Sequence, residues 1–453
     1  MVDQSIVEGA GAPDAPPEIP APDAFGLEAA RPLRHSVAAA TIGNALEFYD
    51  FITYAFFSIQ IGRTFFPSHS AYASLMLSLA TFFAGFVTRP IGGVVIGILS
   101  DRIGRRPAMM FSFTLMGGSI VALALIPSYA AIGIAAPILA VIARMAQGFS
   151  LGGEVGPTTA YLLEAAPTHR RGLIVAWQGA SQGIAATLAA LVGFVLSSLL
   201  PASALDAYGW RIAFLLGAAT LPYGLWLRRG LPETLHTAEH APAHHGEGTH
   251  LELVRGSARI IVLSMFVLAA GTVGTYVFQY MTTFAQHTLH MSPTVAFAAS
   301  AAGNVAGVCS GLFGGWLSDR IGRRPVMILP ALANLVLLLP IFSWITETRT
   351  ALALTVGTVA SGILGSLSGG AFYAALTESL PKRIRGGTFA IVYAVAIALF
   401  GGTTQPLITW LIHVTGSPMA PAWYLFGASA VGLLARWLIV ESAPAKTLTP
   451  APA

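Results

Sequence analysis

The chain has 453 residues, of which 55% are hydrophobic and only 10% are charged, and its mean hydropathy is +0.70. A soluble protein of this length carries about 25% charged residues, so the composition excludes a water-soluble globular protein. The net charge of +4 comes without basic runs that interleave aromatic residues, which argues against nucleic-acid binding. Repeated apolar runs of about 20 residues, each able to cross a bilayer as a helix, predict an all-α integral membrane protein.

The chain begins with an Ala-, Pro- and acid-rich segment at 1–34, which lacks the basic start and apolar core of a secretory signal. We expect a disordered cytoplasmic tail there. Twelve transmembrane helices are then predicted, in two pseudo-symmetric six-helix bundles. The predicted spans are 36–60, 72–99, 107–127, 131–162, 172–200, 209–228, 257–285, 292–317, 326–345, 350–377, 386–413 and 420–440. The predicted domains are an N-terminal bundle at 35–228, a cytoplasmic linker at 229–256, a C-terminal bundle at 257–441 and a cytoplasmic tail at 442–453.

Lys and Arg residues gather in the loops on one side of the predicted bundles, whereas the other side receives Arg63, Arg211 and Arg349. Short loops that face the cytoplasm carry the excess of basic residues in membrane proteins. We therefore expect both termini in the cytoplasm and a multi-pass protein in the plasma (inner) membrane.

Ionisable side chains fall inside the predicted spans of the first half, and the second half has none at that depth. They are Glu47, Asp50, Arg89, Arg144 and Glu154. Such a group costs about 2.5–3.5 kcal/mol on insertion scales, so it persists where it pairs or lines a polar cavity. Glu47 and Asp50 share one helical face, where both cannot be ionised cheaply in a low dielectric. We predict that Glu47, Asp50 or Glu154 carries a proton; alternatively, the acids pair with the arginines and only hold the bundle together.

Arg144, Gln147 and Gly148 lie on one face of the fourth predicted span. A guanidinium offers a planar fork of donors that matches a carboxylate, Gln147 adds an amide, and Gly148 leaves room for close approach. Arg89 lies about 18 Å inward from the loop that follows its span. We predict that Arg144 and Arg89 bind an anionic substrate with Gln147, and the alternative for either arginine is an internal salt bridge.

The second half offers neutral polar side chains that would form the other wall of a central site. Among them, Gln279, Tyr373 and Tyr276 are the candidate substrate ligands. Each of these residue types taken alone is more often found in helix packing or in an interhelix hydrogen bond, and as a set they could line that wall.

One short loop occurs twice, as GILSDRIGRR from Gly97 and as GWLSDRIGRR from Gly315, and a proline follows each copy. Such a repeat predicts two related halves. Orientation in the membrane requires only positive charge, whereas this pattern also keeps an Asp and two Gly. A second repeat pairs EAAPTHRRG at 164–172 with ESLPKRIRG at 378–386. We predict a cytoplasmic gate formed by Gly97, Asp101, Arg102, Arg105, Asp319, Arg320, Arg323, Glu164, Arg171, Glu378 and Arg385.

Other chemistry finds little support in the sequence. The linker at 229–256 contains five histidines without fixed ligand spacing, so we expect a flexible connection and no metal site. The single cysteine, Cys309, excludes an intrachain disulfide. No nucleophile–base pair stands out, and we predict neither an enzyme nor a bound cofactor.

These motifs resemble the major facilitator superfamily, whose signature loop is similar to the doubled G-x-x-x-D-R-x-G-R-R pattern. GNALEFYDF at 43–51, RPIGG at 89–93 and RMAQGFSLGGE at 144–154 resemble its metabolite:proton symporters. AALTESLP at 374–381 is most similar to the citrate and tricarballylate carriers. The chain departs from the family at Phe48, where most members have Trp, and at Gln405, because citrate carriers place the following proline one position earlier.

The resemblance implies a carrier in which two bundles alternately open a midplane site to each side of the membrane. It would import a small carboxylate, citrate or tricarballylate first, together with protons. The alternatives in the same family are 2-oxoglutarate, shikimate, and proline or glycine betaine. A transporter-like receptor is more remote, because neither 1–34 nor 229–256 is long enough for a signalling domain. We expect a monomer.

Overall fold

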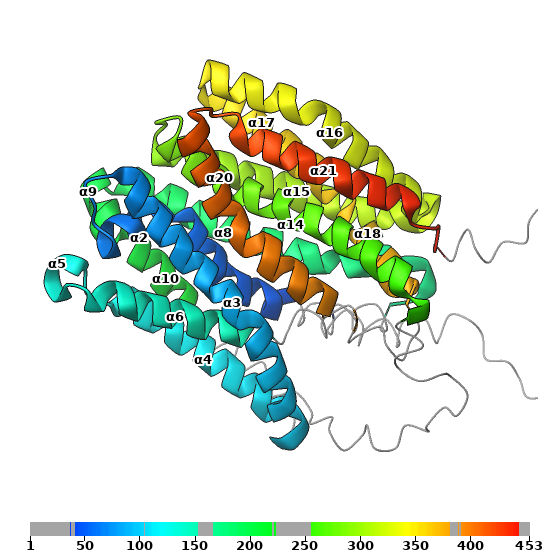
Figure 1. The fold of residues 1–453 in the computed structure, drawn as a ribbon, viewed down its shortest axis with the longest axis horizontal. Coiled ribbons are helices and arrows are strands. Elements are labelled where there is room, and N and C mark those ends of the chain that lie inside the picture. Colours follow the sequence, from blue (N-terminus) through cyan, green and yellow to red (C-terminus); the bar gives the residue numbers. More distant parts are fainter. Residues whose placement is uncertain are drawn as a thin grey trace, which may run out of the picture.

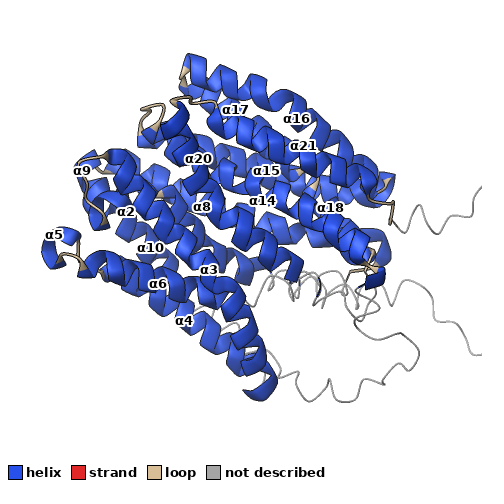
Figure 2. Ribbon diagram, in the orientation of Figure 1, coloured by secondary structure: helices blue, strands red, loops and turns tan. Residues whose placement is uncertain are grey.

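The computed structural model describes residues 37, 41–103, 105–152, 166–219, 222, 255–380, 388 and 391–443. These residues form helices joined by short turns, and none of them forms a strand (Figure 2). Seven helices in the described ranges are long and apolar enough to cross a membrane. Each predicted span coincides with helical residues, which confirms the all-α membrane fold.

The first half begins with a helix at 41–56, which is interrupted at Phe57 and resumes as α2 (Ser58–Phe65). The following elements are α3 (Ala71–Ile103), α4 (Arg105–Leu125), α5 (Tyr129–Ile132), α6 (Ala135–Leu151), η1 (Thr168–Arg170), α8 (Arg171–Leu199), α9 (Ala202–Ala204), η2 (Leu205–Gly209) and α10 (Trp210–Ala218).

The second half repeats this arrangement of long helices. Its elements are α14 (Ala258–His287), α15 (Pro293–Ile321), α16 (Arg323–Thr348), α17 (Ala351–Ser366), α18 (Gly369–Glu378), η3 (Ile397–Gly401), α20 (Gly402–Thr415) and α21 (Ala420–Leu438). The starts of α15 and α17 are capped by Ser292 and Thr350, whose hydroxyls accept from the third backbone N–H that follows.

The two halves lie side by side with their helices running between two ends of the molecule (Figure 1). One end, hereafter the basic end, carries Arg102, Arg171 and Arg320, which lie where α3 ends, α8 begins and α15 ends. The other end, hereafter the opposite end, carries α2, α5 and α9 (Figure 1).

Small residues decide how closely the helices approach. A Cβ added to Gly172 of α8 would lie 2.5 Å from the carbonyl oxygen of Gly315 on α15. Within the first half, a Cβ on Gly148 of α6 would overlap the carbonyl oxygen of Gly85 on α3. These contacts hold α8 against α15 across the two halves and α3 against α6 within the first half.

The repeated loop forms the predicted tight turn in its second copy. Gly322 separates α15 from α16 with a φ of 105°, a conformation that favours glycine. The equivalent Gly104 of the first copy lies outside the described residues.

Candidate functional site

Arg89 of α3 and Arg144 of α6 form the centre of the candidate site. The close approach of α3 and α6 places both guanidiniums inside the first half, where Arg89 is 7% exposed and Arg144 is 1% exposed. Gly148 provides the space between the helices, as predicted. A further contact near the site comes from Gly152, where a Cβ would overlap the Arg89 carbonyl oxygen.

Aromatic rings surround both guanidiniums. The Arg89 Cζ lies 4.3 Å from the centre of the Phe51 ring and 4.6 Å from that of Phe86. The Arg144 Cζ lies 4.3 Å from the Tyr54 ring and 5.2 Å from the Phe82 ring. These contacts stabilise each cation through the face of the ring but leave its charge unneutralised.

The two arginines also keep unused hydrogen-bond donors. Nε and Nη2 of both residues are buried without an acceptor among the described residues. Arg144 Nη1 donates to Gln147 Oε1, which leaves Gln147 Nε2 without a partner. Neither arginine forms an ion pair within the described part of the chain. Buried donors are almost always satisfied in native proteins, so these donors require acceptors beyond those that the described residues supply.

The buried acids lie on the neighbouring helix at 41–56. Asp50 is 1% exposed, its Oδ1 has no hydrogen-bond partner among the described residues, and it interacts electrostatically with Arg144 without forming an ion pair. Glu47 is buried one turn earlier. Glycine at position 217 of α10 is required next to Asp50, because a Cβ there would overlap Asp50 Oδ1. Glu154 lies outside the described residues.

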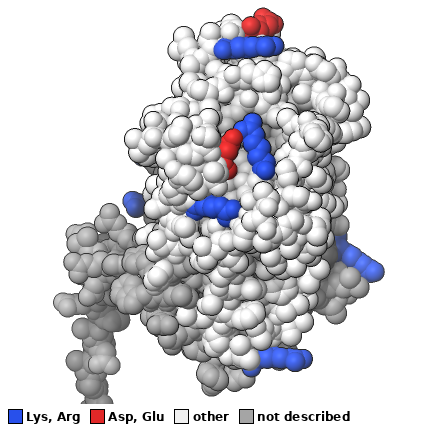
Figure 3. Space-filling view, turned by 90° about the vertical axis from the view of Figure 1, so that its left-hand side faces the viewer, with Lys and Arg blue, Asp and Glu red and all other residues white. Residues whose placement is uncertain are grey.

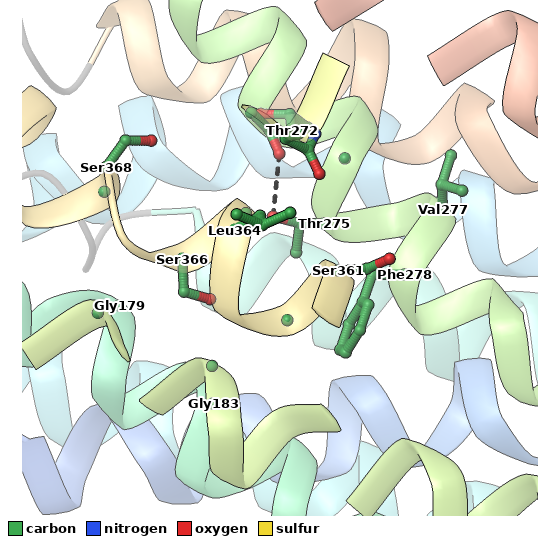
Figure 4. A pocket seen from close by; sticks show the side chains of 18 of the residues that line it. Gly179, Gly183, Thr272, Thr275, Val277, Phe278, Ser361, Leu364, Ser366 and Ser368 are labelled. Atoms are coloured by element: carbon green, nitrogen blue, oxygen red, sulfur yellow. Dashed lines mark hydrogen bonds between the residues drawn. The ribbon is translucent and has the colours of Figure 1, made fainter. Parts of the chain in front are cut away.

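A cavity of about 300 Å³ lies between the halves, and the three candidate ligands of the second half, Gln279, Tyr373 and Tyr276, all line it. Figure 4 shows part of this cavity between α8, α14 and α17, where Gly179 leaves open space on the α8 side. Arg89 and Arg144 do not line the cavity. Tyr276 connects the cavity with the arginines, because it lines the cavity and its side chain interacts with Arg89.

The structure adds residues that the sequence reasoning missed. Tyr54 stacks on Arg144 and lies one helical turn after Asp50, a spacing that could have indicated it. Gln182 of α8 also lines the cavity, and its Nε2 donates to the Tyr393 hydroxyl of the second half over 3.4 Å. The pairing of these two residues joins helices that are distant in sequence, so no local pattern reveals it.

The second copy of the repeated loop forms a contact between the halves at the basic end. Asp319 accepts from the backbone N–H groups of Gly172 (2.8 Å) and Leu173 (2.9 Å), at the start of α8. Arg323 forms one ion pair with Asp319 at 2.7 Å and a second with Glu378 at 2.9 Å. This arrangement places a carboxylate at the positive end of a helix dipole.

The remaining gate candidates are less constrained. Arg320 stacks on Trp316 at 4.3 Å, and Arg102 is exposed. Arg171 is half-buried, and its Nε has no partner among the residues that the structure describes. A Cβ on Gly97 would meet nothing within 4 Å. The side chains of Asp101 and Arg105, and the whole of Glu164 and Arg385, lie outside what the structure describes.

Glu441, which the sequence did not single out, completes the contact at the basic end. Its carboxylate accepts from the backbone N–H groups of Arg323 (2.8 Å) and Arg324 (3.0 Å) and so caps α16. Partial burial tends to raise the pKa of this carboxyl, but four backbone N–H donors outweigh burial and lower the pKa.

Among the described residues, no group of three or more His, Cys, Asp or Glu side chains is placed to hold a metal ion. The five histidines of the linker lie outside those residues.

Comparisons with known proteins agree with this architecture. The chain is 35% identical to a citrate-proton symporter from Salmonella typhi over 89% of this chain and 93% of the relative. It is 31% identical to a proline/betaine transporter from Escherichia coli (strain K12) over 92% of this chain and 86% of the relative. The crystal structure of a D-xylose-proton symporter superposes with a TM-score of 0.73 at 22% identity, covering 91% of this chain and 98% of that one.

The family model described as the Major Facilitator Superfamily matches residues 40–317 and 285–453. Both halves are therefore covered, as the internal repeat requires. The chain belongs to the Major Facilitator Superfamily.

Proposed function

We propose that the protein is a proton-coupled symporter that imports a small carboxylate, with citrate or tricarballylate as the first candidate, by alternating access. The observation that carries the proposal is the buried pair Arg89 and Arg144, whose Nε and Nη2 donors have no acceptor among the described residues. A carboxylate offers planar acceptor oxygens that match such donors. The names of the relatives that are 35% identical to this chain support the same substrate class.

The nearest competing function is uptake of proline or glycine betaine, which the 31% identical relatives favour. A quaternary ammonium group is bound by a cage of aromatic rings. Here the rings of Phe51, Tyr54, Phe82 and Phe86 already face the guanidiniums of Arg89 and Arg144. These rings therefore already surround two cations of the protein itself. The site presents positive charge, which favours an anionic substrate over a quaternary ammonium group.

The proton has candidate acceptors close to this site. Asp50 lies within electrostatic range of Arg144, and its Oδ1 is free to accept or hold a proton. In the proposed cycle, a carboxylate binds the arginines and a proton binds Asp50 or Glu47 before the bundles rock. Each elementary charge that moves inward gains about 2.3 kcal/mol per 100 mV of membrane potential.

We also propose an orientation and a gate. The basic end would face the cytoplasm, with both termini and the linker at 229–256 on that side of the plasma membrane. The contact of Asp319 with the start of α8 would close this end and break when the site opens inward. The domain boundaries at 35–228 and 257–441 and a monomeric state belong to the same proposal.

The proposal is tested by transport in proteoliposomes under an imposed pH gradient. Labelled citrate, tricarballylate, 2-oxoglutarate, shikimate, proline and glycine betaine are offered separately. We expect accumulation of a tricarboxylate that collapses when a protonophore removes the gradient. Uptake of betaine or proline in preference to carboxylates would overturn the substrate class, and uptake that ignores the gradient would overturn proton coupling.

A further inference from the structure

A second cavity lies between the halves at the opposite end. It measures about 220 Å³ and is lined by Tyr72 of α3, by residues of α14 and by residues of α20. The lining residues are Tyr72, Tyr280, His287, Thr288, Thr409, Ile412 and His413. Neither the central arginines nor the gate at the basic end uses this cavity.

The cavity is rich in hydrogen-bond donors and free of acids. Its polar groups are two imidazoles, two phenols and two hydroxyls, and no Asp or Glu lines it. The Oγ1 atom of Thr288 is buried and has no hydrogen-bond partner among the described residues. Such a set of groups suits an oxygen-rich ligand that brings its own acceptors.

The charges around the cavity are cationic or already paired. His287 interacts electrostatically with His290 and with Arg63 of α2. Arg63 is paired with Asp206 at 2.5 Å, so this acid is engaged away from the cavity. The other described acid at this end, Glu347, accepts from Ser343 at 2.6 Å. Acidic atoms accordingly occupy little of the face seen in Figure 3.

His413 is held in place by the other half of the molecule. Its ring stacks on Tyr72 with 3.8 Å between ring centroids and an interplanar angle of 12°. Tyr72 from α3, with His287 and Tyr280 from α14, are the titratable groups that share the cavity with it. This stacking lets Tyr72 position the His413 ring within the cavity.

A row of polar groups leads from this cavity toward the central arginines. Thr409 donates to the Tyr280 hydroxyl at 2.8 Å, forming the floor of the cavity. One turn before Thr409 on α20, the Gln405 side chain donates to the Tyr276 carbonyl oxygen at 3.4 Å. Tyr276 in turn interacts with Arg89. The cavity therefore lies at the outer end of a series of buried polar contacts that reaches the candidate substrate site.

We propose that this cavity is a titratable vestibule, in which protonated His287 and His413 capture the anionic carboxylate before it reaches Arg89 and Arg144. The inference rests on the proposed function, because it assigns a route to that substrate. An imidazole becomes charged as the external pH falls through its pKa. Burial, with the neighbouring His290 and Arg63, lowers the pKa of His287, so this side chain becomes charged only in acidic medium. The vestibule thus attracts the anion under the same acidic conditions that supply the coupling proton.

The test measures KM and maximal rate of carboxylate uptake at external pH 5.5 and pH 8 in wild type and in a His287→Gln/His413→Gln variant. We expect the KM of the variant to exceed that of wild type about tenfold at pH 5.5 and to match it within about twofold at pH 8, with similar maximal rates. Because both proteins face the same substrate ionisation, the ratio of their KM values isolates the histidines. The unchanged rate at pH 8 shows that the variant is folded.

His169→Gln is the matched control, because His169 is an exposed histidine at the basic end. Tyr72→Phe should retain the pH-dependent KM, whereas Tyr72→Leu should lose part of it. A KM ratio between the double variant and wild type that is the same at both pH values would overturn the vestibule while leaving the proposed function intact. Absence of carboxylate transport in wild type and His169→Gln would instead remove the proposed function and the vestibule with it.

Discussion

Two arginines in this molecule are equally buried and have opposite surroundings. Arg144, in the first half, is 1% exposed, lies among aromatic rings and forms no ion pair among the described residues. Arg323, in the second half, is 0% exposed and pairs with both Asp319 and Glu378. The chain thus neutralises one buried cation completely and leaves the other available.

We interpret this difference as one between a structural charge, Arg323, and a proposed binding charge, Arg144. A buried pair is strongly destabilised when one partner is removed, because the other charge is left uncompensated. An unpaired buried cation carries its desolvation cost in the resting protein, and a bound anion offsets that cost. Removing Arg323 should therefore damage the fold, whereas removing Arg144 should damage transport.

The largest effect is expected for Arg144→Gln, which removes the unpaired charge and keeps a polar group of similar reach. Carboxylate uptake should fall about 100-fold or more, because a desolvated charge pair with the substrate is lost. The unfolding temperature should stay at or above that of wild type. Initial rates of uptake and thermal unfolding measure the two effects, with Arg170→Gln as the control, because Arg170 is exposed and belongs to neither the candidate site nor the predicted gate. Undiminished uptake would show that Arg144 is not a substrate ligand.

The next effect concerns coupling and tests the acid beside Arg144. Asp50→Asn cannot release or take up a proton at this position, so accumulation driven by a pH gradient should be abolished. Exchange of internal for external substrate, which needs no net proton movement, should persist. The pair of assays is run together with Glu47→Gln, and full gradient-driven accumulation by Asp50→Asn would assign the proton to another group.

On the structural side of the comparison, Arg323→Gln should destabilise the protein by about 3–5 kcal/mol, because it leaves Asp319 and Glu378 without their cation. The double variant Arg323→Met/Glu378→Leu should recover part of this loss by replacing the pair with apolar side chains. Denaturant or thermal unfolding in detergent measures both variants. A single variant as stable as wild type would mean that the pairing has no structural role.

A smaller effect is expected where the two halves touch. Gly172→Ala places a methyl group 2.5 Å from the Gly315 carbonyl oxygen and from Arg323 Nη1, and it should cost about 1–3 kcal/mol by overpacking. Gly179→Ala, on the same helix, is the matched control, because a Cβ there meets nothing within 4 Å. Equal unfolding temperatures for the two variants would contradict the close contact between α8 and α15.

The smallest effect is expected at Glu441, whose lowered pKa makes its contribution depend on pH. A carboxyl with a pKa lowered by folding stabilises the native state above its unfolded pKa of about 4.3, and this contribution disappears as the pH falls through the folded pKa. Glu441→Gln should therefore lower the unfolding temperature at pH 7 and should have no such effect once the pH lies below the folded pKa. A difference that persists in acid would mean that the lost contact is not electrostatic.

The fold could be predicted from the sequence because apolar length and an internal repeat are local signals. The doubled loop indicated two halves, and the buried Arg89 and Arg144 indicated a charged centre in the first of them. What the sequence could not show was which charges meet. Arg323 and Glu378 lie far apart in the chain, as do Tyr72 and His413, and only the packing of helices brings them together.

The aromatic surroundings of Arg89 and Arg144 could not be predicted from the sequence either. Phe51, Phe82 and Phe86 sit in spans that consist mostly of apolar residues, so the sequence does not distinguish them from ordinary packing residues. Their role depends on the rotation of three helices about their axes. That rotation is set by the contacts of Gly148 and Gly152 with α3, which no single-span pattern encodes.

The most direct test of the central claim compares ligand stabilisation of wild type and an Arg89→Gln/Arg144→Gln variant. A ligand that binds the native state alone raises the unfolding temperature by mass action. Citrate or tricarballylate should raise the unfolding temperature of wild type and leave that of the variant unchanged, and glycine betaine should affect neither. Equal stabilisation of both proteins by citrate, or stabilisation of wild type by betaine alone, would contradict an anion site built on these two arginines.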